Sequence, residues 1–144
     1  EHDKTLVIHC REAWDDCLTI LEDHGAPDRV VMHCFSGDEA VVDRCAEHGW
    51  FMSFAGNVTF KNAEPLRSAA ARAPRELLLT ETDSPFLTPH PHRGERNDPS
   101  YVPLVTTQLA ELHDLDVDRM AAELDRNARR AFGLPDPMSQ ARAS

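Results

Sequence analysis

Three side chains that can bind a divalent metal stand at the ends of short apolar runs. His9 and His33 each end such a run, and Asp83 comes two residues after a third. Runs of this kind are typical of buried parallel strands. Because the carboxyl ends of parallel strands open onto the ligand site of an α/β protein, side chains there act on ligands rather than on packing. Imidazole and carboxylate bind divalent transition metals, so the pattern predicts part of a metal site.

Each of these residues also has an ordinary structural interpretation. A histidine at a strand end can be a satisfied polar group at the edge of the core, and His9 alone would not decide between the two interpretations. His33 repeats the arrangement in the next strand. A carboxylate such as Asp83 beside a buried run is costly when it is unpaired, and a metal ion would relieve that cost.

The elements that must position these residues alternate between strand and helix. Strand patterns occupy residues 5–9, 29–33, 50–54 and 77–81, and helical patterns occupy 13–24, 38–48, 64–73, 102–113 and 118–132. Near-continuous apolar strands separated by helices favour burial on both faces, hence an α/β fold with parallel strands and right-handed crossovers. Such units can form an open sheet, or half of an eight-stranded barrel, which typically needs about 250 residues.

A long segment, residues 84–99, is rich in Pro, His and Arg. Loops of this length inside a compact domain are usually functional or disordered. Arg93 and Arg96 lie in it, and the planar guanidinium group matches phosphate geometry, so both are candidate substrate-binding residues. The alternative is that they form ion pairs with Glu95, Asp98 or an acidic helix face.

Other residues near the strand ends also leave two interpretations open. Arg11 can contact a substrate phosphate, as a third substrate-binding candidate, or pair with Glu81 and brace the strand ends. A platform for base stacking needs an exposed aromatic ring, and only Phe60, Phe86 and Tyr101 fall in expected loops.

The composition limits the possible partners. A net charge of −10 argues against a protein that covers nucleic acid with a broad basic surface, although it does not exclude a small phosphate site beside metal ions. The sequence has no run long enough for a membrane span and no signal segment, so we expect no membrane partner and a cytoplasmic location. The four cysteines lack metal-finger spacing and fit reduced cytosolic thiols. Because the chain starts at Glu1 rather than Met, we expect an upstream portion to be missing.

Five segments in this order resemble the motifs of the TatD-type metal-dependent deoxyribonucleases. They are residues 8–13 (IHCREA), 33–37 (HCFSG), 53–61 (SFAGNVTFK), 81–87 (ETDSPFL) and 91–99 (PHRGERNDP). The two helical patterns that follow continue the resemblance to about residue 134.

The resemblance implies an amidohydrolase-like TIM barrel that uses one or two divalent cations (Mg, Zn or Mn) to cleave DNA phosphodiester bonds. His9, His33 and Asp83 match its metal-ligand positions, and Asp83 is also the catalytic candidate. The family's His-x-His pair and bridging glutamate have no counterpart here. We therefore expect residues 1–134 to be the C-terminal four βα units of the barrel, and 135–144 a polar tail.

Two other functions stay open beside DNA cleavage. A barrel of this class can hydrolyse ester or amide substrates with the same metal site. Alternatively, the chain is a non-catalytic half-barrel that needs a partner, because an open half-barrel leaves sheet edges and an apolar face uncovered. We expect that partner to be the missing N-terminal half-barrel or a second copy of the chain.

Overall fold

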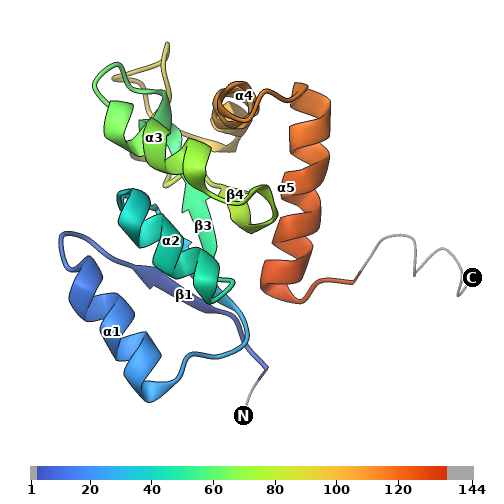
Figure 1. Ribbon diagram of the computed structural model, residues 1–144. Helices are drawn as coiled ribbons and strands as arrows, with labels where there is room; N and C mark the ends of the chain where they lie inside the picture. Colours follow the sequence, from blue (N-terminus) through green and yellow to red (C-terminus); the bar gives the residue numbers. More distant parts are fainter. Residues whose placement is uncertain (1–2, 136–144) are drawn as a thin grey trace, which may run out of the picture.

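The computed structural model describes residues 3–135 and contains one parallel sheet. Its strands lie in the order β1-β2-β3-β4, which is also their order along the chain (Figure 1). They span Leu6–His9 (β1), Val30–His33 (β2), Phe51–Phe54 (β3) and Leu78–Thr80 (β4). Every neighbouring pair is parallel, so all four carboxyl ends lie along one edge of the sheet.

Helices follow the strands as the sequence predicts. They are α1 (Trp14–His24), α2 (Glu39–Glu47), α3 (Glu64–Arg72), α4 (Val102–Leu112) and α5 (Val117–Phe132). Short 3-10 turns lie at Gly56–Thr59 (η1), Arg75–Leu77 (η2) and Pro99–Tyr101 (η3). Helices α1, α2 and α3 follow one another along one side of the sheet, and α5 stands beside β4 (Figure 1). The α/β fold with parallel strands is therefore confirmed.

Local hydrogen bonds explain where two of the helices begin. The Asp38 carboxylate accepts a hydrogen bond from the backbone N–H of Val41 at 3.0 Å and caps α2. The Asp116 carboxylate accepts from the N–H groups of Asp118 and Arg119 and caps α5 in the same way. Such caps satisfy N–H groups that have no partner within the helix.

The core lies between the sheet and its helices. Its largest fully buried side chains include Phe35, Phe54, Met32 and Met52. Strand β1 departs from the expected burial on both faces, because it pairs with a neighbour on one side only and its Val7 is 52% exposed. Within residues 3–135, no helix has both the length and the apolar character that crossing a membrane requires.

Candidate metal centre

The carboxyl ends of β1 and β2 bring two histidines side by side. His9 and His33 are paired in the parallel register, and their ring centroids are 5.6 Å apart. His9 is exposed, whereas the His33 side chain is 34% exposed. The two predicted imidazole ligands are therefore neighbours at the edge where all four strands end.

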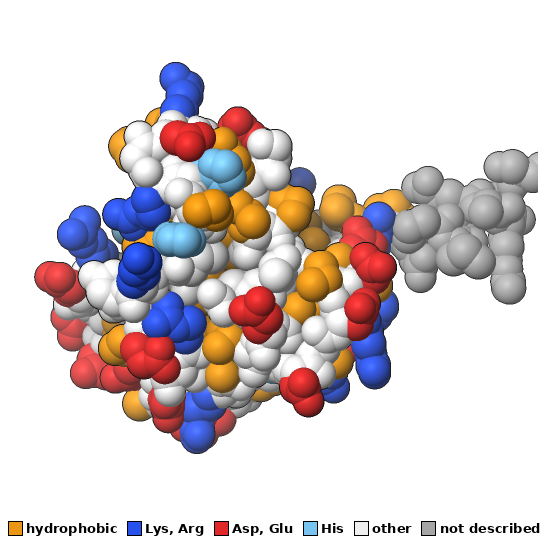
Figure 2. Space-filling model, turned by 90° about the horizontal axis from the view of Figure 1, so that it is seen from above, with side chains coloured by type: hydrophobic (Ala, Val, Ile, Leu, Met, Phe, Trp, Pro, Cys, Tyr) orange, Lys and Arg blue, Asp and Glu red, His pale blue; other side chains and the backbone are white. Residues whose placement is uncertain are grey.

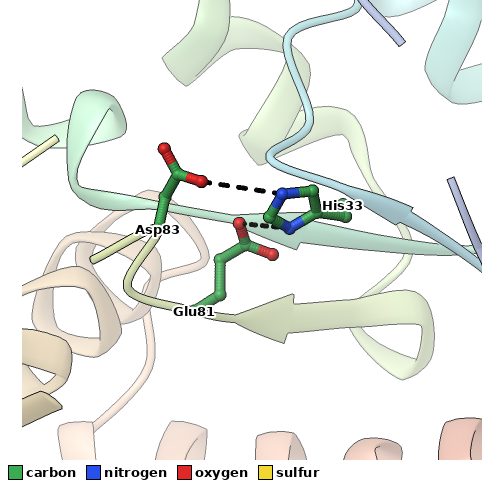
Figure 3. Close-up of side chains that lie close together, drawn as sticks. All are labelled: His33, Glu81 and Asp83. Atoms are coloured by element: carbon green, nitrogen blue, oxygen red, sulfur yellow. Dashed lines mark ion pairs between the residues drawn. The ribbon is translucent and has the colours of Figure 1, made fainter. Parts of the chain in front are cut away.

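His33 lies between two carboxylates that follow β4. Its Nδ1 is 2.8 Å from Oε1 of Glu81, and its Nε2 is 3.6 Å from Oδ1 of Asp83. Figure 3 shows both acidic side chains reaching from the segment after β4 toward the imidazole ring. One ligand atom from each residue lies within 4.8 Å of the others, and all three side chains are half-buried. This arrangement is what a shared cation requires.

The backbone beyond β4 explains how two carboxylates reach the same ring. The N–H of Glu81 donates to the carbonyl of Phe54 at 3.0 Å, which extends the sheet pairing by one residue. β4 ends at Thr80, and the turn that follows it brings the carboxylates of both Glu81 and Asp83 to the His33 ring. Asp83 has a left-handed backbone (φ +56°), a conformation that aspartate tolerates better than most residues and that is common at functional sites.

The donor set fits a divalent cation. Oε1 of Glu81 is buried and accepts no hydrogen bond among the described residues, although Nδ1 of His33 is near it. A buried carboxylate oxygen without a donor is costly, and the positive charge of a cation held at this centre would reduce that cost. One imidazole and two carboxylates are ligands that Zn²⁺ and Mn²⁺ accept, and Mg²⁺ accepts the carboxylates.

The thiol of Cys34, next to His33, lies in a buried environment close to the negative charges of Asp83 and Glu81. Burial raises the pKa of Cys34 to about 11, and the charges of Asp83 and Glu81 add to this effect. Carboxylates raise the pKa of a neighbouring thiol because like charges disfavour the thiolate. The centre therefore concentrates negative charge, which favours cation binding.

His9 does not join the group formed by His33, Glu81 and Asp83. That group is the one set of metal-binding side chains found close together among residues 3–135, and His9 only flanks it. Its role as a ligand stays a prediction. Glu81, in contrast, joins the group, although its sequence position suggested only a pairing with Arg11.

The predicted pairing of Arg11 with Glu81 is wrong. Arg11 follows β1 and Glu81 follows β4, and these strands form opposite edges of the sheet. Glu81 contacts His33 instead, and Arg11 is exposed without a hydrogen bond or ion pair to the described part of the chain. The alternative role of Arg11, contact with a substrate phosphate, is untested.

The two loop arginines differ in their surroundings. Cζ of Arg93 lies 3.5 Å from the centroid of the Phe60 ring, a cation–π contact. Arg96 is exposed and has no hydrogen bond or ion pair within residues 3–135. Neither arginine pairs with Glu95, which accepts from Tyr101, or with Asp98, which caps η3. The ion pairs considered as an alternative with these two acids are therefore not formed.

Arg93 belongs to an open pocket with basic side chains. The pocket has a volume of about 360 Å³, and its lining residues are Phe60, Lys61, Asn62, His90, Pro91 and Arg93. Figure 2 looks down on the molecule and shows Lys and Arg side chains gathered on one side of that face, with His side chains nearby. A local basic site is thus present on a chain of net charge −10.

The long loop that carries Arg93 and Arg96 is ordered by buried contacts. The Asn97 amide, only 3% exposed, donates to the carbonyl oxygens of Thr82 (2.7 Å) and Phe86 (2.6 Å). At Gly56 an added Cβ would lie 1.9 Å from the Leu87 carbonyl oxygen, so only glycine permits this approach. Sequence reasoning missed Asn97, because a buried amide inside a polar loop leaves no periodic signal.

Comparisons with known proteins agree with this geometry. The family model described as TatD related DNase matches residues 1–133. The chain is 47% identical to an uncharacterized metal-dependent hydrolase TatD of Mycobacterium tuberculosis, over 91% of this chain and 50% of that protein. It is 45% identical to the uncharacterized metal-dependent hydrolase YabD of Bacillus subtilis, over 90% of this chain and 51% of that protein.

A solved structure extends the likeness to the fold. The crystal structure of YjjV, a TatD homologue from Escherichia coli, superposes with a TM-score of 0.83 at 29% identity, covering 90% of this chain and 50% of that chain. The chain thus spans about half the length of the relatives it matches. Together with the centre formed by His33, Glu81 and Asp83, these matches establish that the chain belongs to the TatD family of metal-dependent hydrolases.

Proposed function

We propose that this chain forms the C-terminal half of a TIM barrel that hydrolyses DNA phosphodiester bonds with divalent metal ions. The observation that carries the proposal is the group of His33, Glu81 and Asp83 at the carboxyl edge of a parallel sheet. Active sites of TIM barrels lie at that edge. The location that we propose for the enzyme is the cytoplasm.

The residues of the centre would have different roles in binding the metal ion. His33 and Asp83 would hold an ion, with His9 beside them, and Glu81 would fix the orientation of the His33 ring through Nδ1. Such an ion, when bound, lowers the pKa of a water molecule and polarises a phosphoryl oxygen. Asp83 would also act as the general base that accepts a proton from water, as a carboxylate can.

Support for a DNA substrate comes from the basic pocket. Lys61, His90 and Arg93 line it, and a guanidinium group binds phosphate oxygens through paired hydrogen bonds. Arg96 and Arg11 are exposed and available for further phosphate contacts. The description of the matching family as DNases supports the same substrate.

An apolar groove next to the exposed edge strand β1 supports the half-barrel and its need for a partner. A groove of about 440 Å³ lies between the sheet and the last two helices. Apolar side chains of Val7, Val31 and Leu79 line it together with His33 and Glu81. In a complete barrel, layers of side chains from all eight strands fill this space, so the proposal requires the other four strands, or a second copy, to cover it.

The test is the substitution Asp83→Asn in the complete barrel, assayed on DNA with added Mg²⁺, Mn²⁺ or Zn²⁺. The variant keeps the size of the side chain but loses its charge, and we expect hydrolysis to fall by at least about 100-fold. Asp98→Asn is the matched control, because an asparagine can still cap η3 and that residue lies outside the centre. Near-wild-type rates in Asp83→Asn would overturn the assignment.

A parallel assay separates DNA cleavage from the alternative hydrolysis of esters or amides. The curated relatives are described only as metal-dependent hydrolases, so the bond that is cleaved has to be measured. We expect metal-stimulated cleavage of DNA and no comparable turnover of acyl esters or amides. The reverse pattern would retain the metal centre and reject the phosphodiester substrate.

A further inference from the structure

Phe86 is an exposed aromatic residue whose backbone is held in place by hydrogen bonds a few residues after Asp83. Its side chain is 69% exposed and it lies three residues after Asp83. The backbone N–H of Phe86 donates to the carbonyl of Asp83 at 2.9 Å, which closes a turn. A large apolar ring held in solvent beside a catalytic candidate is available for a ligand.

The other end of the Phe86 backbone is held as well. Its carbonyl oxygen accepts a hydrogen bond from the Asn97 amide at 2.6 Å, and the same amide donates to Thr82 at 2.7 Å. Asn97 thus ties the residues on both sides of Asp83 together. Because this backbone is ordered before any ligand arrives, binding against the ring loses little conformational entropy.

The other two loop aromatics already have partners. Phe60 lies beneath the guanidinium group of Arg93, at 3.5 Å. The Tyr101 ring stacks on His92 with centroids 4.7 Å apart, and its hydroxyl donates to Glu95 at 2.9 Å. Of the three rings that the sequence placed in loops, Phe86 is therefore the one whose face is open.

We propose that the Phe86 ring is a stacking platform for an unpaired nucleobase next to the phosphate at the metal centre. The inference rests on the proposed function, and it adds a contact to a base of the substrate beside the contacts to its phosphate. A base in a duplex is already stacked and paired, whereas a base in a single strand can place its face on an aromatic side chain. Stacking of this kind tolerates any base sequence, because every base has a π face.

The decisive variants are Phe86→Leu and Phe86→Trp in the complete barrel. Leucine keeps the apolar volume without an aromatic face, whereas tryptophan keeps and enlarges the face. We expect Phe86→Leu to raise KM for a single-stranded oligonucleotide at least about fivefold with little change in kcat. We expect Phe86→Trp to retain the wild-type KM.

An abasic oligonucleotide of the same length tests the same contact from the substrate side. Wild type should show a higher KM for the abasic strand, and Phe86→Leu should treat both strands alike. With a 2-aminopurine strand, binding should quench the fluorescence in wild type and Phe86→Trp but not in Phe86→Leu. Ile20→Ala is the control, because that exposed apolar side chain lies on α1 and outside the loop.

Two results overturn the inference and one concerns the proposed function instead. If Phe86→Leu retains the wild-type KM and quenching, the ring does not stack on a base. If Phe86→Trp impairs folding while Phe86→Leu does not, another part of the barrel covers the ring. If wild type cleaves no DNA at all, the proposed function fails, and the fluorescence measurement still decides whether the ring binds a base.

Discussion

At the scale of single residues, the two carboxylates of the centre have different relations to the same imidazole. Glu81 is 2.8 Å from Nδ1 of His33, whereas Asp83 is 3.6 Å from Nε2. The shorter contact, between Glu81 and Nδ1, leaves no room for an ion between these two groups. The longer contact places Asp83 near Nε2, which is the ring nitrogen that remains for a metal. We therefore assign ring orientation to Glu81 and ligation to Asp83. A carboxylate next to the ring nitrogen that does not bind the metal fixes the tautomer and the basicity of a metal-binding histidine.

The substitution Glu81→Gln tests this division. The amide keeps the size of the side chain but removes the charge that faces Nδ1, and we expect affinity for Zn²⁺ or Mn²⁺ to fall about 10- to 100-fold. Isothermal titration calorimetry of the complete barrel measures the change. The control is Glu47→Gln at the exposed end of α2, which should bind metal like the wild type. An unchanged affinity in Glu81→Gln would exclude the orienting role.

Arg93 supports a second prediction at this scale, because it lies in a basic pocket and stacks on Phe60. Removing one contact between a basic side chain and a DNA phosphate weakens DNA binding equally for all base sequences. It also reduces the slope of the logarithm of the binding constant against the logarithm of the salt concentration by about one. We expect this result for Arg93→Gln in equilibrium binding of single-stranded DNA at several salt concentrations. Arg126→Gln on the exposed side of α5 is the control, and an equal effect there would show that only net charge matters.

At the scale of elements, a histidine connects two helices. Nε2 of His113, just after α4, lies 3.0 Å from the carbonyl of Ala70 in α3 and is placed to donate to it. Burial lowers the pKa of His113 below its usual 6.5, and the bond to Ala70 only partly opposes this effect. The folded state therefore holds this imidazole neutral, which is the form that burial favours.

The lowered pKa predicts how stability depends on pH. The unfolded chain binds a proton at His113 more readily than the folded chain. The stability that depends on a neutral His113 is therefore fully present above about pH 6.5, and it is lost as the pH falls below that value. We expect urea unfolding to give a smaller free energy at pH 5.5 than at pH 7. His113→Gln should reduce this difference, whereas the exposed His24→Gln should retain it. An undiminished difference in His113→Gln would contradict the assignment.

At the scale of the whole molecule, the sheet is open along β1. Leu6 and Val7 are 37% and 52% exposed there, and the edge presents unpaired backbone groups to any further strand. The same strand borders the apolar groove through Val7. Exposed edges of this kind pair with other chains unless a charge, a bulge or a covering element prevents it.

This edge predicts self-association of the chain by itself. We expect sedimentation velocity to show concentration-dependent oligomers of residues 1–144, because β1 is an exposed edge strand that borders an apolar groove. Val7→Lys should shift the distribution toward monomer, since a lysine at an edge strand disfavours pairing. Ile20→Lys, at a 58% exposed position of α1, should leave the oligomers unchanged. A wild-type chain that stays monomeric at every concentration would rule out this consequence of the open edge.

The sequence by itself determined the order of strands and helices and the position of His9, His33 and Asp83 at or just after strand ends. Apolar runs and the residue types that end them are local signals, because each acts through neighbours in the chain. Tertiary structure alone decided that Glu81 contacts His33 rather than Arg11, because that choice depends on β1 and β4 being opposite edges. The burial of Asn97 likewise depends on contacts between segments distant in sequence, which no local pattern encodes.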